Sequence, residues 1–154
     1  MYKKLQNSII KIEDNSDIPL DINNIDYKEY LEWIDMGNTP QSKSLSEVQT
    51  DKILEIESAY QSAITANIDY MSYTFQSDVP THDNIKSVLS CGSVPDGFAW
   101  FDINNTSIPM TYLDLQGLSK VLVFRGFVAF AKKQVLKSQV RAAIDTNTIQ
   151  ALVW

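Results

Sequence analysis

The sequence predicts an α+β protein that is predominantly helical, with two long helices, a small β-hairpin and an N-terminal extended arm. Three observations carry this prediction. Thr111–Asp145 contains no proline and has apolar residues at helical spacing. Ser44–Tyr73 carries a second helical stripe, and two short apolar runs flank Asn104-Asn105-Thr106, as in a hairpin.

The 154 residues fit one domain, or one domain with an attached arm. We divide them into an arm and short helix over residues 1–43 and a helical domain with the hairpin over residues 44–154.

The net charge of −6 argues against non-specific nucleic-acid binding. Acids outnumber bases in Met1–Val79 and bases outnumber acids in Pro80–Trp154, so the halves could attract each other; the plainer alternative is two solvated faces.

The first 43 residues begin with Met1–Glu13, whose partial alternation predicts a strand or an extended arm. A polar loop follows over Asp14–Leu20. Asn24 is placed to cap a helix over Ile25–Met36, and Gly37 fits its left-handed C-terminal cap. One face of this helix is apolar; it contains Tyr27, Tyr30, Leu31 and Ile34, with Trp33 beside them.

The helix predicted over Ser44–Tyr73 has an apolar stripe from Ile53 to Met71 and an acidic opposite side. Asn67 falls on this stripe, where an asparagine could fix the register of a coiled coil. The alternative is a polar residue at the edge of an ordinary packed helix.

The middle of the chain reads as turns around a short helix. The turn-forming residues Asp78, Pro80 and Asp83 predict a break over Phe75–Asp83. The next residues, Asn84–Cys91, are expected to form a short helix that ends before Gly92. Val94–Gly97 has the composition of a turn. Strands are then expected over Phe98–Ile103 and Ser107–Met110.

The helix expected from Thr111 begins with Thr111 and Asp114, a variant of the capping box. Its middle, Val121–Ala131, is apolar almost all round, which predicts burial on every side by other elements or other copies of the chain. A strand over Val121–Phe130 is the competing interpretation, because β-branched and aromatic residues favour strands. The run is too short to span a membrane, and Arg125 lies inside it, so we expect no membrane insertion.

The residue patterns predict no catalytic residue, no cofactor site and no metal site. His82 is the only histidine and Cys91 the only cysteine, and neither has a neighbouring motif that would orient it. We expect Cys91 to be a buried, unreactive side chain of the short helix. The aromatic residues are expected to be core or interface anchors.

Two stretches resemble bacteriophage tail proteins. Asp26–Gln41 resembles a segment that recurs in tailed-phage tail-fibre and tail-fibre-assembly proteins; the matching residues are Asp26, Tyr27, Tyr30, Leu31, Trp33, Gly37, Asn38, Thr39 and Pro40. Phe75–Trp154 resembles an uncharacterised C-terminal domain attached to many phage tail proteins, with Asn84 where a serine is commoner. Its matching residues are Phe75, Asp78, Trp100, Thr111, Asp114, Leu115, Ala143, Ile144, Asp145 and Trp154.

The resemblance implies a structural component of a phage tail, located in the virion tail after synthesis in the host cytoplasm: a fibre segment, a fibre adaptor or a baseplate-peripheral subunit. The alternative is a tail-fibre assembly chaperone that is not retained in the virion. No enzymatic activity is implied. The expected partners are other tail proteins of the fibre or baseplate and further copies of the chain, with a trimer favoured. The residues expected to contact a partner are Tyr27, Tyr30, Trp33 and Trp154.

Overall fold

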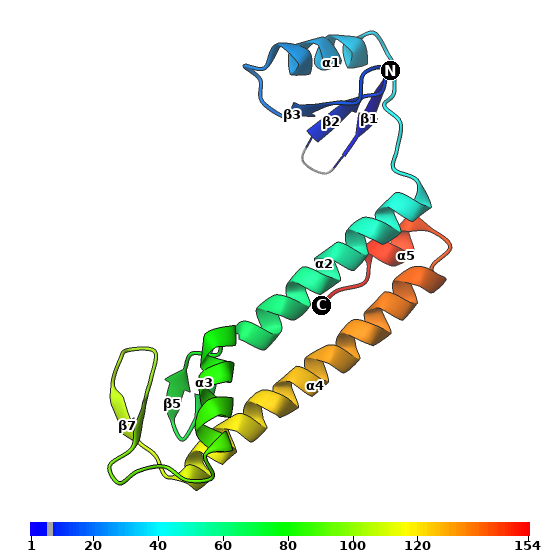
Figure 1. The fold of residues 1–154 in the computed structure, drawn as a ribbon. Coiled ribbons are helices and arrows are strands. Elements are labelled where there is room, and N and C mark those ends of the chain that lie inside the picture. Colours follow the sequence, from blue (N-terminus) through cyan, green and yellow to red (C-terminus); the bar gives the residue numbers. More distant parts are fainter. Residues whose placement is uncertain (6–7) are drawn as a thin grey trace.

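Two long antiparallel helices form the body of the protein, with a small sheet unit at one end and two hairpins at the other (Figure 1). The structure, a computed structural model, describes residues 1–5 and 8–154. The strands are β1 (Tyr2–Lys4), β2 (Ser8–Lys11), β3 (Ser16–Pro19), β4 (Ile68–Tyr70), β5 (Tyr73–Phe75), β6 (Ala99–Phe101) and β7 (Ser107–Pro109). The helices are α1 (Ile25–Asp35), α2 (Leu45–Thr65), α3 (Val79–Ser90), α4 (Tyr112–Ala142) and α5 (Thr146–Gln150). The predicted class, α+β and predominantly helical, is confirmed.

The N-terminal residues form a folded unit, which we call the N-terminal unit (residues 1–43), in place of a simple extended arm. Strands β1, β2 and β3 make an antiparallel sheet in that order, with Ile9 opposite Ile18. Helix α1 begins after Asn24, whose side chain accepts from the Tyr27 N–H as predicted. The polar loop predicted over Asp14–Leu20 is wrong, because Ile18 turns inward from β3 and is buried under α1.

Helix α2 starts as predicted and ends earlier than predicted. Ser44 and Glu47 form a complete capping box at its start. The helix stops at Thr65, and the residues expected to continue it form the β4–β5 hairpin, with positive φ at Met71 and Ser72. This pairing buries Ile68 and Phe75 in one core. Asn67 lies in the connection after α2, so both predicted places for it, on a coiled-coil stripe and at the edge of an ordinary packed helix, are wrong.

Helix α3 starts earlier than the sequence predicted. Asp78 caps it by accepting from the Thr81 N–H, and Pro80 lies in the first turn, where its missing N–H costs no helical bond. The break expected up to Asp83 is therefore wrong. The helix ends at Ser90. Gly92 follows this end as predicted and has a positive φ, which is usual for a glycine just after a helix. The β6–β7 hairpin is confirmed, with shorter strands than expected.

Helix α4 confirms the long helix and its capping box from Thr111 and Asp114, which excludes the alternative of a strand over Val121–Phe130. Its buried residues lie on one side only, from Leu115 to Val140. Near its start it packs on α3 and the hairpins, and near its end on α2 and α5. The prediction that Val121–Ala131 is buried on every side is wrong for the single chain, because most of these side chains are exposed.

Candidate interaction surface

The exposed side of α4 carries a continuous group of apolar side chains. Val123, Phe124 and Phe127 are 69%, 68% and 68% exposed. Leu122 and Ala129, in the same stretch, are buried on the opposite side against the rest of the chain. We call the exposed group the outward face of α4; its members are Val121, Val123, Phe124, Phe127, Val128, Phe130, Ala131 and Val135.

The outward face is large for a monomeric protein. A phenylalanine can bury roughly 200 Å², so the exposed parts of Phe124, Phe127 and Phe130 alone amount to roughly 350 Å². The four valines of the outward face bring the total above the roughly 300–600 Å² of a typical largest surface patch. A patch of this size and composition is characteristic of a protein–protein contact.

The side of α4 next to this face is fixed to α2 by Arg125. Its guanidinium donates to the carbonyls of Ile64 and Ala66 at 2.5 Å each, where α2 ends and its last carbonyls have no helical partner. Arg125 also donates to the Ser77 hydroxyl, which lies 2.9 Å from Nε2 of His82. Burial lowers the pKa of Arg125 from its ordinary value. Arg125 thus joins the end of α2, the start of α3 and the middle of α4.

A pocket of about 400 Å³ lies between α2, α3 and α4, beside this junction. Its lining is largely apolar, from Tyr60 and Ile64 of α2, Ile85 of α3 and Leu122 of α4. Val123 belongs both to the lining and to the outward face. The apolar surface of α4 therefore continues into a hollow on this side.

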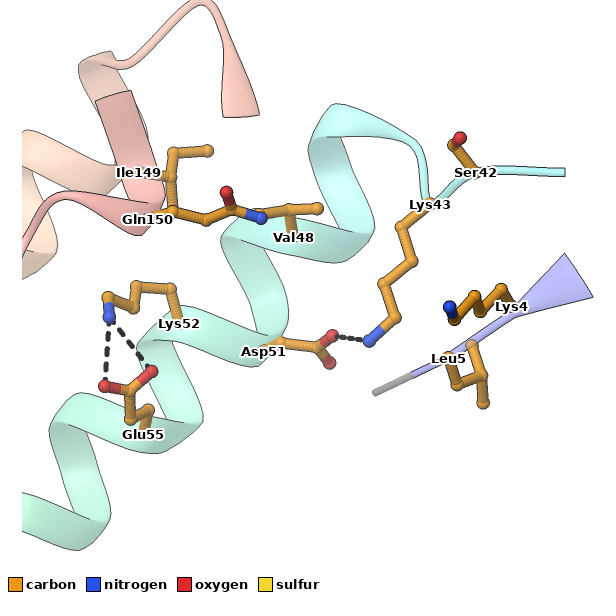
Figure 2. A pocket seen from close by; sticks show the side chains of 10 residues that line it. All are labelled: Lys4, Leu5, Ser42, Lys43, Val48, Asp51, Lys52, Glu55, Ile149 and Gln150. Carbon is orange, nitrogen blue, oxygen red and sulfur yellow. Dashed lines mark hydrogen bonds and ion pairs between the residues drawn. The ribbon is translucent and has the colours of Figure 1, made fainter. Parts of the chain in front are cut away.

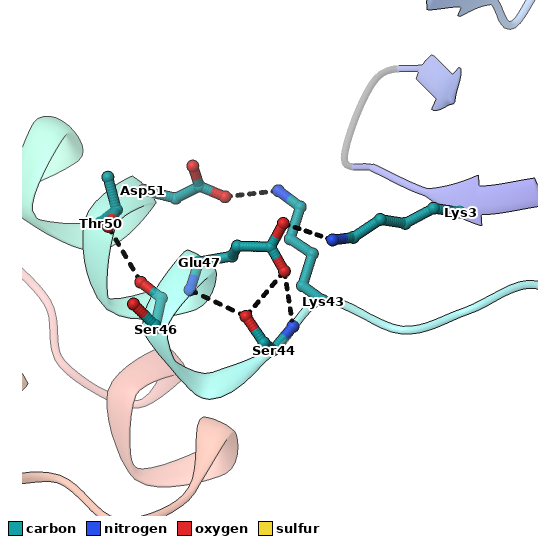
Figure 3. A network of polar contacts seen from close by, with 7 residues as sticks. All are labelled: Lys3, Lys43, Ser44, Ser46, Glu47, Thr50 and Asp51. Carbon is teal, nitrogen blue, oxygen red and sulfur yellow. Dashed lines mark hydrogen bonds and ion pairs between the residues drawn. The ribbon is translucent and has the colours of Figure 1, made fainter. Parts of the chain in front are cut away.

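Two ion pairs and a capping box connect the N-terminal unit and its linker to α2 (Figure 3). Lys3 of β1 pairs with Glu47, and Lys43 pairs with Asp51. Glu47 also accepts from the Ser44 N–H at 2.8 Å and from its hydroxyl at 2.7 Å. The hydrogen bond from Lys3, followed by those from Ser44, lowers the pKa of Glu47 from 4.5 to about 2. Glu47 is therefore ionised across the ordinary pH range and holds both the linker end and the sheet.

The pocket of about 500 Å³ beside this connection lies between β1, α2 and α5 (Figure 2). Most of its charges are neutralised within the chain, because Lys43 pairs with Asp51 and Lys52 pairs with Glu55 at 2.9 Å. Local pairing of this kind leaves little net charge to attract an ionic ligand, so we assign this pocket a structural role.

The structure places the four predicted contact residues in two separate regions. Tyr30 is buried in the N-terminal unit, with its ring 5.3 Å from that of Tyr2, and Tyr27 and Trp33 are half-buried beside it. Trp154 is half-buried near α2, 6.4 Å from the Tyr60 ring and 5.2 Å from Lys132 Nζ. These aromatic side chains pack mainly within their own chain, and their contact with a partner stays a prediction.

The sequence predicted that Val121–Ala131 would be covered by other elements or other copies of the chain, but it did not predict which side of α4 its own chain leaves exposed. This run is apolar around almost the whole circumference of the helix, so no side stands out as the one that the chain itself covers. The exposed cations Lys120 and Lys132, which directly precede and follow the apolar stretch Val121–Ala131, were the available signal.

The two residues considered for catalysis do not meet. His82 lies in the first turn of α3 and Cys91 at its C-cap, about 13 Å apart along the helix axis at 1.5 Å per residue. Cys91 is exposed, so its predicted burial is wrong: the short helix turns its other side, with Ile85, Val88 and Leu89, to the core.

Among the described residues, no group of three metal-ligating side chains occurs and no helix is apolar and long enough to cross a membrane.

Comparison with known proteins gives one match. Residues 47–152 match the family described as Domain of unknown function (DUF4376). This stretch runs from the first turn of α2 to the residues just after α5, and it includes the whole outward face of α4. The N-terminal unit lies outside the match. No curated protein matches the chain. No solved structure matches it either.

Proposed function

The chain belongs to the DUF4376 family, whose function is unknown, and from the resemblance of Asp26–Gln41 and Phe75–Trp154 to phage tail proteins, together with the surface of α4, we propose that it is a structural component of a bacteriophage tail. In this proposal it acts through protein–protein contacts, as a fibre segment, a fibre adaptor or a baseplate-peripheral subunit. It is a homo-oligomer, with a trimer favoured, and its other partners are tail proteins.

The observation that carries the contact function is the outward face of α4. Its phenylalanines and valines are exposed on a well-packed helix, so their exposure does not arise from a loose fold. Large exposed aromatic side chains on a rigid element are the usual anchors of protein interfaces. Arg125 and Lys132 lie beside the outward face, and both are engaged within their own chain, Arg125 with the end of α2 and Lys132 with the Trp154 ring.

The assignment to a phage tail is supported by the resemblance of Asp26–Gln41 to tail-fibre and fibre-assembly proteins. In this chain that segment covers α1, Gly37 and the start of the linker, and α1 packs on the β1–β3 sheet. The segment is therefore part of a folded unit attached to α2, which is the arrangement expected of an adaptor with two separate contact regions.

Mass spectrometry of purified virions tests the proposal. The structural role predicts peptides of this chain in intact particles, at a stoichiometry fixed relative to other tail proteins. Absence from virions, together with binding to fibre protein in the infected cell, would assign the chain as the assembly chaperone instead. Absence from both would contradict the tail function altogether.

A further inference from the structure

The outward face of α4 has the register of a coiled-coil seam. Apolar or small residues recur at alternating steps of three and four, and all of them are exposed. In heptad terms, the a positions are Val121, Val128, Val135 and Ala142, and the d positions are Phe124, Ala131 and Ser138. We call these seven residues the α4 seam. We propose that the α4 seam joins three parallel copies of this chain around a common axis. This deepens, and rests on, the homo-oligomeric part of the proposed function.

The α4 seam lies on the side of α4 away from its own chain. At 3.6 residues per turn, Phe124, Ala131 and Ser138 lie more than a quarter-turn from the buried Leu122, Ala129 and Leu136. Helices α2 and α5 pack on that buried side. A neighbouring α4 can therefore approach along the α4 seam without displacing the elements that already cover α4.

The charges beside the α4 seam are compatible with identical copies. Arg125 and Lys132 occupy flanking e positions, but Arg125 is bonded to the end of α2 and Lys132 lies over the Trp154 ring of its own chain. The g positions between the ends are Phe127 and Gln134, which are uncharged. Lys120 and Arg141 lie at the two ends, where water can solvate them, so like charges do not oppose one another along the middle.

The width of the apolar surface favours three copies over two. A two-stranded coiled coil uses the narrow a and d stripe alone. Here Val123, Phe127 and Phe130 extend the exposed apolar surface to one side of the α4 seam, by roughly a third of a turn. Each helix in a three-stranded assembly touches two neighbours, so it can cover this wider surface.

The exposed area sets the scale of an interface between copies. Each copy offers more than roughly 600 Å² of apolar side chain on the outward face, which a three-fold assembly would divide between two neighbours, whereas a standard stable interface takes about 800 Å² from each of two partners. Cyclic symmetry is the usual arrangement for copies of one chain, and helices that run along a three-fold axis are necessarily parallel.

Light scattering on the purified full-length chain at micromolar concentration tests this inference. The parent is expected at about 52 kDa, three times its 17.4 kDa. Phe124→Glu and Val128→Glu each place a carboxylate in the α4 seam and are expected to give a species of 17.4 kDa with unchanged helical content by circular dichroism. Leu54→Glu is the matched control, because Leu54 is an apolar residue of α2 whose exposed fraction, 63%, lies between those of Val128 and Phe124, and it is expected to leave the trimer intact.

Each result decides the inference. A parent that is monomeric at these concentrations overturns it, and so does a trimer that survives both glutamate substitutions. A trimer that persists in this way leaves the tail function standing, because another surface could join the copies. Conversely, a parent trimer that both glutamate substitutions dissociate would support the α4 seam. If that chain were absent from virions and from fibre complexes, the tail function alone would be contradicted.

Discussion

The N-terminal unit and the middle of α4 both contain apolar helical surface, which is buried within the chain in the first and exposed in the second. Helix α1 lays Tyr30 and its neighbours on the β1–β3 sheet, where Tyr2, Ile9 and Ile18 complete a closed core. Helix α4 covers one side and leaves Phe124 and Phe127 exposed on the other. The comparison teaches that an apolar helical face identifies a contact but does not say whether its partner is in the same chain.

The largest expected effects are losses of stability, which should differ between a substitution in the buried core and one in the outward face of α4. Leu118 is fully buried, so Leu118→Ala should lower the free energy of unfolding by about 2–5 kcal/mol at any protein concentration. Phe124→Ala should lower stability only at concentrations where copies associate, since the association itself contributes the stability that is lost.

Denaturant melts at two protein concentrations, tenfold apart, make this comparison. We expect the gap between the parent and Phe124→Ala to shrink on dilution and the gap for Leu118→Ala to stay constant. An equal and concentration-independent loss for both variants would mean that Phe124 is packed within its own chain.

A smaller effect is expected from Arg125→Ala, at the junction behind the outward face. The substitution leaves the carbonyls of Ile64 and Ala66 and the Ser77 hydroxyl without the donor they now have, which should cost about 1–3 kcal/mol. The matched control is Arg141→Ala on the exposed surface of the same helix, expected within about 0.5 kcal/mol of the parent. Equal losses in chemical denaturation would show that the junction contributes little.

The smallest effect concerns acid and the N-terminal unit. The pKa of Glu47 is lowered from 4.5 to about 2 in the folded chain, so its contribution to stability is complete above pH 4.5 and is lost as the pH falls towards 2. An NMR titration of the Glu47 carboxyl carbon should give a midpoint far below 4.5. Lys3→Met removes the leading cause and should raise that midpoint; an unchanged midpoint would show that Ser44 alone sets it.

The sequence predicted the starts of α1, α2 and α4 well, because the signals at a helix start are local, but it placed the start of α3 five residues too late. Asn24 and Thr111 are confirmed as N-caps, α2 begins within one residue of the predicted Ser44, and Gly37 and Gly92 have the left-handed backbone expected after a helix. The end of α2 was missed, since Ile68 and Met71 also fit the helical spacing, and the hairpin is favoured by the tertiary packing of Ile68 and Phe75. Helical spacing alone could not distinguish these alternatives.

The candidate surface was harder to predict, for a physical reason. Which side of α4 is covered depends on where α2, α3 and the hairpins pack, and these contacts join residues far apart in the sequence. The bonds from Arg125 to the end of α2 span about 60 residues and have no local signature. The aromatic face of α1 was read as a contact for a neighbour because its partner, the β1–β3 sheet, was predicted only as an arm.

Cysteine cross-linking through the α4 seam tests the central claim most directly. In a Cys91→Ser background, Ser138→Cys places one thiol at a d position near one end of the α4 seam, and Ser58→Cys on the outside of α2 is the control. Parallel copies bring the three Cys side chains at position 138 within disulfide range, whereas an antiparallel pair centred on the α4 seam would separate them by roughly 20 Å. We predict rapid oxidation to a covalent dimer for the variant at 138 and none for the control. No cross-link at 138, or equal cross-linking at both positions, would contradict the claim that the outward face of α4 joins parallel copies of the chain.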